Sequence, residues 1–224
     1  VSVAAPGDDP YVDAGPVPVT ISTATGGGFE QLTADPTAAV TLVTDTVDVT
    51  TVSLTASPSV AEGGQIVYTA SLTNAAASPV TVSLDNGAVI TIAAGATSGS
   101  VSVAAPGDDV YVDGGTVSAS ISTATGGNFE QLTVDGKAAS TTVTDTVDVT
   151  VVSLTGPGSV AEGGSAGYTV SLTSVAQSPV TVSLSYSGTA ADGSDYTGVA
   201  SVVIPAGSSS ANFTLATAND ALAE

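Results

Sequence analysis

The sequence almost lacks positive charge, and it lacks the side chains that most often carry catalysis or bind soft metals. It has 21 acidic residues against one base, Lys137, and no Arg, His, Cys, Met or Trp, so its formal net charge is −20. The absence of cysteine excludes disulfides and thiol chemistry, and without imidazole or thiolate the usual ligands of zinc and copper are missing. The net charge repels nucleic acid and anionic lipid and attracts cations.

Enzymatic activity is not expected from the side chains that are present. A Ser or Thr nucleophile would have no His partner, and the single Lys occurs in only one copy of the repeat described below. Two carboxylates can act as the acid and base of a glycosidase. That chemistry usually also needs aromatic side chains that hold the sugar, and aromatic residues make up only 4% of this chain.

Long apolar runs are also absent, and no segment approaches the ~20 residues of a membrane-spanning helix. The chain begins at Val1 without Met and without a recognisable signal peptide, which we interpret as a piece of a longer protein. Val, Thr, Ser and Ala are abundant, and 42% of the residues are hydrophobic, which is enough for a core. The β-branched residues among them favour strands.

The sequence repeats itself with a spacing of 100 residues. GDDPYVD at 7–13 returns as GDDVYVD at 107–113, and the spacing later grows to 112 because the last copy carries 12 extra residues. A period near 100 residues is that of a whole small domain. We therefore divide the chain into the C-terminal part of a first copy (1–49), a complete copy (50–149) and the N-terminal part of a third copy (150–224), with the extra residues between its third and fourth strands.

Short β-rich runs, bounded by Gly, Pro, Asn and Asp, follow one another in the complete copy. The expected strands are 50–56, 65–73, 79–84, 88–93, 99–104, 116–124 and 140–146. Seven short strands in 100 residues predict an all-β fold of tandem immunoglobulin-like Greek-key β-sandwiches arranged end to end. The residues expected to face inward are Tyr68, Val67, Leu72, Val82, Ile92, Val101, Val103 and Ile121.

Alternation of strand direction places most acids of the complete copy at one pole. The loops after the first, third and fifth strands and the end of the seventh hold Glu62, Asp85, Asp108, Asp109, Asp113, Asp145 and Asp148. The other pole has only Glu130, Asp135 and Lys137 among charged residues. A pair of like charges ~4 Å apart costs roughly 1 kcal/mol in water and about 4 kcal/mol at an effective dielectric constant of 20. A bound cation would remove this cost, and calcium takes 6–8 oxygen ligands.

Two other interpretations of these acids stay open. Acids in turns such as GDD are often simply solvated. Magnesium also binds carboxylates, although it keeps more of its waters than calcium does.

Several motifs resemble the Calx-beta pattern: SVAEGG…YTVSLT, ADGSDYTGVASVVIPAGSSSANFTLATAND, DDVYVDGGTVSASISTATGG and TTVTDT. Copies of about 100 residues rich in Val and Thr are also similar to the extender repeats of giant calcium-dependent bacterial surface adhesins of the RTX biofilm type. The resemblance implies calcium held by acids of the first turn, of the later loops and of the last strand end. With the linker acids added, the candidate ligands are Glu62, Asp108, Asp109, Asp113, Asp145 and Asp148 in the complete copy, Asp8, Asp9, Asp13, Asp45 and Asp48 in the first, and Glu162, Asp195 and Asp220 in the third.

The chain departs from the Calx-beta pattern at two places. The complete copy lacks the GSDY segment, so that only Asp85 could serve in its place, and Asn219 replaces one acid of the DD pair in the third copy. We expect fewer ions in the former and a weaker site in the latter. Asp108 and Asp109 are expected to be the central ligands of the complete copy.

The function implied by the resemblance is structural: a stalk segment of a secreted, cell-surface adhesin, in which calcium at domain ends and junctions stiffens the tandem array for adhesion or biofilm formation. The expected partners are calcium ions and neighbouring repeats, with neither nucleic acid binding nor membrane insertion. One alternative is a module that binds a glycan or protein. Another is a filament subunit that associates head to tail by strand addition, since 150–224 lacks the last two strands and 1–49 holds their equivalents. An arbitrary boundary explains the same ends.

Overall fold

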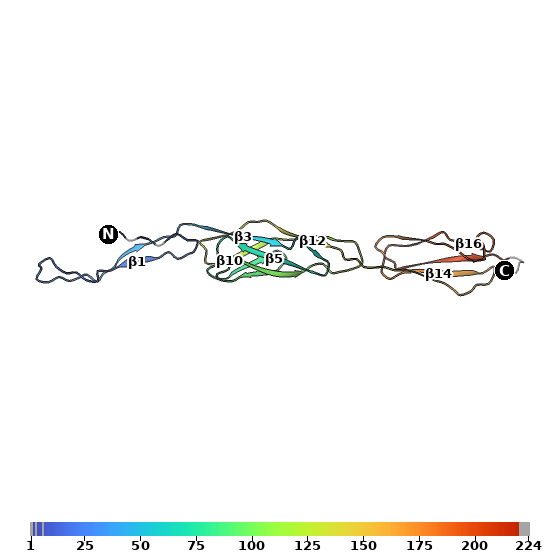
Figure 1. The fold of residues 1–224 in the computed structure, drawn as a ribbon, viewed down its shortest axis with the longest axis horizontal. Coiled ribbons are helices and arrows are strands. Elements are labelled where there is room, and N and C mark those ends of the chain that lie inside the picture. Colours follow the sequence, from blue (N-terminus) through green and yellow to red (C-terminus); the bar gives the residue numbers. More distant parts are fainter. Residues whose placement is uncertain (1, 3, 6, 220–224) are drawn as a thin grey trace. The chain divides into compact units, whose positions relative to one another are not determined.

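The computed structural model describes residues 2, 4, 5 and 7–219, and their regular secondary structure consists of β-strands (Figure 1). The chain forms two compact units. Unit 1 comprises residues 1–108 and 113–145, and unit 2 comprises residues 109–112 and 146–224. The all-β, immunoglobulin-like fold class is thereby confirmed. Within the described ranges, the search for a helix long and apolar enough to cross a membrane finds none.

The strands of unit 1 fall into four small sheets. They are β1 (Pro16–Val19), β2 (Ala39–Leu42), β3 (Val49–Ala56), β4 (Ser59–Ala61), β5 (Gln65–Leu72), β6 (Val80–Leu84), β7 (Val89–Ile92), β8 (Ser98–Ala104), β9 (Gly115–Ala119), β10 (Ile121–Gly126), β11 (Gln131–Val134) and β12 (Ala139–Thr144). The sheet orders are β11-β3-β5-β8, β4-β12-β9, β10-β6-β7 and β1-β2. The last of these belongs to the first copy, and its strand residues are all exposed.

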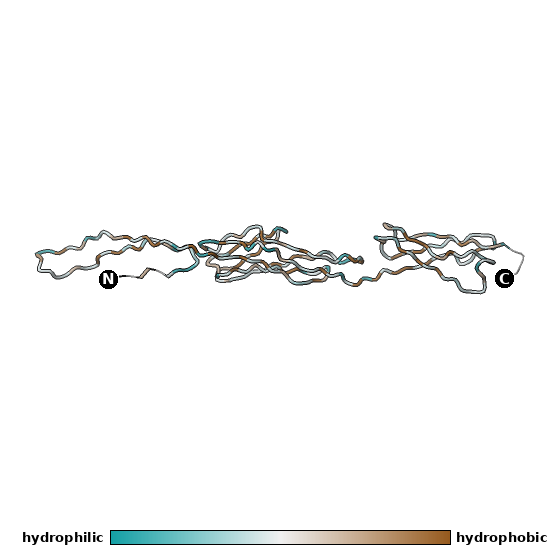
Figure 2. The backbone as a smooth tube through the Cα atoms, turned by 90° about the horizontal axis from the view of Figure 1, so that it is seen from above, coloured by the Kyte–Doolittle hydropathy of each residue, from teal (hydrophilic) through white to brown (hydrophobic). Residues whose placement is uncertain are grey.

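The core of unit 1 follows the period-two alternation of its strands. In β5 every second side chain is buried, and the inward residues pack with those of β6 and β7. Hydrophobic residues accordingly recur along these strands (Figure 2). The expectation that Val67 faces inward is wrong, because Val67 neighbours Tyr68 on the same strand and is 40% exposed while Tyr68 is fully buried. The predicted Val101, Val103 and Ile121 are partly buried against this core.

The complete copy contains three more strands than its sequence predicts. The short β4 pairs in parallel with β12, and β11 pairs in parallel with β3. The run 116–124 was expected to be one strand but forms two, β9 and β10. Asp85 explains the break: its amide donates to the Ser120 carbonyl at 3.0 Å, and its Oδ1 accepts from the Ser120 amide at 3.1 Å.

The hydroxyl of Tyr68 gives a first testable prediction. Tyr68 is fully buried, and its hydroxyl finds no hydrogen-bond partner among the described residues. Burial raises the pKa of Tyr68, and the charge of Asp85 adds to the rise. Tyr68→Phe should therefore leave the unfolding free energy at pH 7 unchanged or raise it by up to about 1 kcal/mol, because no internal hydrogen bond is lost.

The same substitution should change the alkaline limb of the stability profile. Above the ordinary tyrosine pKa of about 10 the unfolded chain loses its proton first, so wild-type stability falls as pH rises towards the higher folded pKa. Tyr68→Phe should abolish the part of this alkaline loss of stability that comes from ionisation of Tyr68. Urea unfolding measured between pH 7 and pH 11 checks it, and two parallel profiles would contradict it.

Unit 2 has a smaller core than unit 1. Its strands are β13 (Val152–Thr155), β14 (Ser165–Leu172), β15 (Val180–Ser183), β16 (Tyr196–Thr197), β17 (Ser201–Ile204) and β18 (Ser210–Thr217). They form the sheets β13-β14-β18-β16 and β15-β17. The segment between β15 and β17, which contains the extra residues of the third copy, carries β16. The buried core cluster consists of Val170, Val202 and Ile204.

The outer strand of unit 2 is less covered than its counterpart in unit 1. Val52 and Leu54 of β3 are 0% and 6% exposed, whereas Val152 and Leu154 at the same repeat positions of β13 are 47% and 53% exposed. In unit 1 the β3 strand is flanked by β11 and packs near β10 and β12. The described residues of unit 2 contain no counterparts of these three strands.

Candidate functional site

Two parallel strands of unit 1 bring two acids to the same edge. The strands β4 and β12 run in parallel, with Ala61 opposite Thr144. Glu62 follows β4 directly and Asp145 follows β12 directly, so their side chains leave neighbouring strands at the same level. The Glu62 amide donates to the Thr144 carbonyl at 3.0 Å and fixes this register.

A third acid reaches the same edge from the antiparallel neighbour of β12. Asp113 precedes β9, and its amide donates to Oδ1 of Asp145 at 3.2 Å. Between Asp113 and the strand, Gly114 passes so close to Asp145 that a Cβ atom there would lie 2.9 Å from the same oxygen. Only glycine permits this approach without a shift of the neighbours. The first copy has Ala14 at the corresponding position.

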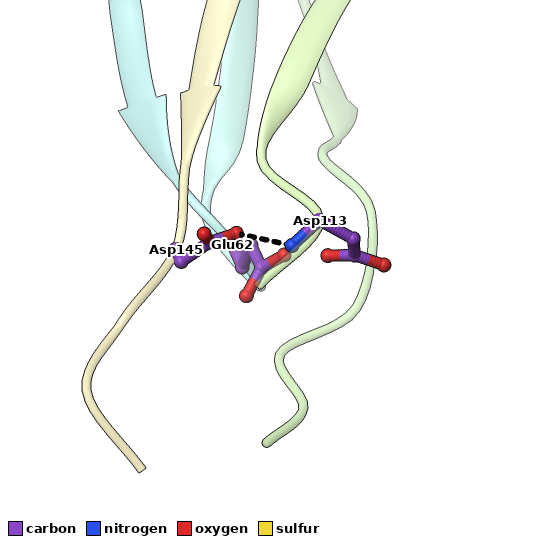
Figure 3. A group of neighbouring side chains, drawn as sticks. All are labelled: Glu62, Asp113 and Asp145. Atoms are coloured by element: carbon purple, nitrogen blue, oxygen red, sulfur yellow. Dashed lines mark hydrogen bonds between the residues drawn. The ribbon is translucent and has the colours of Figure 1, made fainter. Parts of the chain in front are cut away.

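Together these acids form a group of three carboxylates at neighbouring strand ends of unit 1 (Figure 3). One oxygen from each of Glu62, Asp113 and Asp145 lies within 4.8 Å of the others. Glu62 is only 7% exposed and its Oε2 is shielded from solvent, Asp145 is half-buried and Asp113 is exposed. A cavity of about 250 Å³ borders Glu62 and Asp113. Partial burial among like charges disfavours three ionised carboxylates unless a positive charge joins them.

The other acids predicted for the complete copy lie elsewhere. Asp108 lies beside the turn that carries Glu62, since a Cβ on Gly63 would lie 3.4 Å from the Cβ of Asp108, but it is not in the group of three. Asp109 belongs to unit 2, where its Oδ1 accepts the Tyr111 amide at 2.7 Å. Asp148 is exposed and also belongs to unit 2. The group thus contains Asp113 and neither of the two aspartates expected to be central.

The first copy contributes a second acidic cavity to unit 1. This cavity of about 530 Å³ is lined by Asp8, Asp9, Asp13, Asp45 and, from the complete copy, Glu130. Asp48 does not line it, but its amide donates to Oε2 of Glu130 at 2.6 Å, and the hydroxyl of Thr46 donates to Asp8. The described residues that line this cavity include no counterpart of Glu62.

Glu130 is a candidate that sequence reasoning missed. Strand alternation within a single copy places Glu130 at the pole opposite the other acids. Within unit 1, however, this pole of the complete copy meets the acidic pole of the first copy, as the lining of the cavity shows. The recurrence of Phe-Glu at 29–30 and 129–130 was the available signal.

The acids of the third copy form a looser arrangement. Glu162 is exposed, Asp195 is half-buried, and both line a cavity of about 330 Å³ with Tyr186 and Tyr196. Oδ2 of Asp195 accepts the Ala191 amide at 2.6 Å. Partial desolvation raises the pKa of Tyr196, and nearby acids add to the rise. The predicted Asp220 lies outside the described residues.

Comparison with known families gives one match that covers nearly the whole chain. The LapA domain family matches residues 1–46, 48–146 and 148–223. No curated protein is significantly similar to the chain.

Proposed function

This chain belongs to the LapA domain family, and from that premise we propose that it is an extender segment of a large bacterial adhesin, in which calcium at the domain ends stiffens the array. The family is related to large biofilm adhesins and is associated with the cell surface. In this proposal the tandem β-sandwiches act as spacers that project a distant binding domain from the cell.

The observation that carries the calcium proposal is the group formed by Glu62, Asp113 and Asp145. Calcium binds oxygens at 2.3–2.6 Å, so two ligands on opposite sides of one ion are at most about 5 Å apart. Carboxylate oxygens within 4.8 Å of one another fit this limit. Solvent water and neighbouring carbonyls would complete the 6–8 ligands. The near-complete burial of Glu62 favours a bound ion over simple solvation, because removing an ionised carboxylate from water costs free energy unless a positive charge compensates it.

The second acidic cavity supports the stiffening part of the proposal. Its acids come from two consecutive copies, four from the first and Glu130 from the complete copy. A cation held there would be bound by both copies at once. It would oppose bending at their junction, because separating the copies would also break its coordination. Calcium would thus act both by relieving repulsion and by linking domains.

Thermal unfolding with and without calcium tests this function. The chain is melted in chelator and in millimolar calcium, and calcium should raise the melting temperature of unit 1. The stabilisation reaches about 2.7 kcal/mol when free calcium exceeds the dissociation constant 100-fold. Equal ionic strength, set with sodium chloride, is the control for simple screening of the −20 charge.

Two outcomes would contradict the proposal. Identical melting curves in chelator and calcium would remove the ion from the function. A stabilisation that sodium chloride reproduces would reduce it to screening. Small-angle scattering then addresses stiffness, since a calcium-dependent joint should give a narrower range of particle lengths in calcium than in chelator.

A further inference from the structure

The tyrosine of the GDD-x-YVD stretch in the first copy packs on the complete copy. Tyr11 stacks on Phe129 with ring centroids 5.9 Å apart, and its hydroxyl donates to the Ala75 carbonyl at 2.7 Å. Tyr11 and Phe129 also form an isolated antiparallel β-bridge. The Val12 amide donates to the Asn128 carbonyl at 3.1 Å, and the Glu130 amide donates to the Pro10 carbonyl at 3.0 Å.

Unit 2 repeats this contact one copy later. Residues 109–112 belong by sequence to the complete copy but cluster with the third copy. There the Tyr111 hydroxyl donates to the Val175 carbonyl at 2.8 Å. Tyr11 and Ala75 are 64 residues apart, and so are Tyr111 and Val175, so the same repeat positions are used twice. The ring stack is not repeated, because the third copy has no counterpart of Phe129 among the described residues.

The first copy has a phenylalanine, Phe29, at the repeat position of Phe129, and no ring stack is seen on it among the described residues. Phe29, at the repeat position of Phe129, is 68% exposed, whereas Phe129 is 8% exposed. Both rings fold back over a glycine with positive φ: a Cβ would lie 2.4 Å from the ring at Gly27 and 2.2 Å from it at Gly127. Each ring therefore lies over the second glycine of its turn, and Phe129, which belongs to the core of the complete copy, is the ring on which Tyr11 stacks.

The second aspartate of GDD holds the backbone next to the tyrosine through a side-chain hydrogen bond. Oδ1 of Asp9 accepts the Tyr11 amide at 2.9 Å, and Oδ1 of Asp109 accepts the Tyr111 amide at 2.7 Å. This local turn fixes the backbone from which the tyrosine side chain projects.

We propose that the tyrosine of each GDD-x-YVD stretch is a latch between consecutive copies: the hydroxyl of Tyr11 or Tyr111 binds the carbonyl of the next copy's turn at Ala75 or Val175, and the ring of Tyr11 also stacks on Phe129. At Tyr11 the contact comprises the hydroxyl hydrogen bond, two backbone hydrogen bonds, a hydrogen bond from the Asn128 side-chain amide to the Val12 carbonyl at 3.3 Å and the ring stack, so it requires no cation. It goes beyond the calcium function and stands without it.

Amide hydrogen exchange of the full chain in chelator tests the latch. The reporters are the Val12 and Glu130 amides, which donate across the two copies, and the Tyr68 amide reports on unfolding of the core. Tyr11→Ala should raise the exchange rates of both reporters at least about tenfold, because the hydroxyl bond and the ring stack are both lost. Tyr11→Phe, which keeps the ring, should raise them by a smaller factor.

Two phenylalanines provide a matched control pair. Phe129→Ala should accelerate the Val12 and Glu130 amides as Tyr11→Ala does, while Phe29→Ala, at the same repeat position but uncovered, should leave them unchanged. The latch is overturned if the reporters are unprotected in wild type in chelator, or if Tyr11→Ala leaves their rates unchanged. If Tyr11→Ala also accelerates the Tyr68 amide, Tyr11→Phe decides, and unchanged reporters in that variant overturn the hydroxyl bond. Calcium-independent protection together with failed calcium stabilisation would support the latch and contradict only the calcium function.

Discussion

Replacement of Glu62 by glutamine is expected to stabilise unit 1 in chelator and to remove most of the stabilisation that calcium gives. In chelator, Glu62→Gln deletes the most buried of three clustered carboxylates and so relieves like-charge repulsion. At about 4 Å this repulsion is worth roughly 1 to 4 kcal/mol per pair, depending on the effective dielectric constant. In calcium the same change deletes a charged ligand, so wild type should become the more stable protein.

The inversion of sign separates a cation site from a purely structural role of Glu62. Urea unfolding of wild type and Glu62→Gln, each in chelator and in calcium, gives the four free energies that are required. A structural role, such as a hydrogen bond lost on substitution, would make the variant less stable in both conditions. That outcome, or an unchanged calcium response, would contradict the assignment of Glu62 as a ligand.

The third copy provides a control at the same repeat position. Glu162 is exposed, and it does not belong to any group of three close acids among the described residues. Glu162→Gln removes the same charge from the chain as Glu62→Gln. It should therefore reproduce any general effect of net charge, but it should not produce the inversion at unit 1.

The fold class could be predicted from the sequence because the period-two pattern of a half-buried strand is local. The strand β5 illustrates this, since its alternation shows directly in the residue types. The three additional strands could not be predicted in the same way. β4 has three residues and β11 has four, and both exist because they pair in parallel with strands that are distant in sequence.

The same distinction applies to the candidate site. That Glu62 and Asp145 lie together followed from strand direction alone, although the parallel pairing that places them was not foreseen. The choice between Asp108 and Asp113 depends on the close approach at Gly114, which depends on tertiary contacts rather than on spacing. Glu130 was missed for a related reason, because its neighbours belong to another copy.

The contrast between β3, which β11 and β5 flank, and β13, which lies at the edge of its sheet, leads to the second large effect. Leu54→Ala should destabilise unit 1 by about 2–5 kcal/mol, since Leu54 is 6% exposed within the main core and its truncation leaves a cavity. Leu154→Ala should cost unit 2 less than about 1 kcal/mol, because Leu154 is 53% exposed at the same repeat position. Urea titrations followed by NMR, with Ile90 reporting on unit 1 and Val170 on unit 2, measure both values separately.

Comparison of Leu54→Ala with Leu154→Ala also tests whether the exposed face of β13 is buried in solution. If Leu154→Ala proves as costly as Leu54→Ala, the face of β13 is buried in solution although it is exposed in the isolated chain. A dependence of that cost on protein concentration would then point to strands supplied by a second chain, as in head-to-tail strand addition. A small cost at all concentrations would instead show that unit 2 folds around the core cluster of Val170, Val202 and Ile204 without burial of the β13 face.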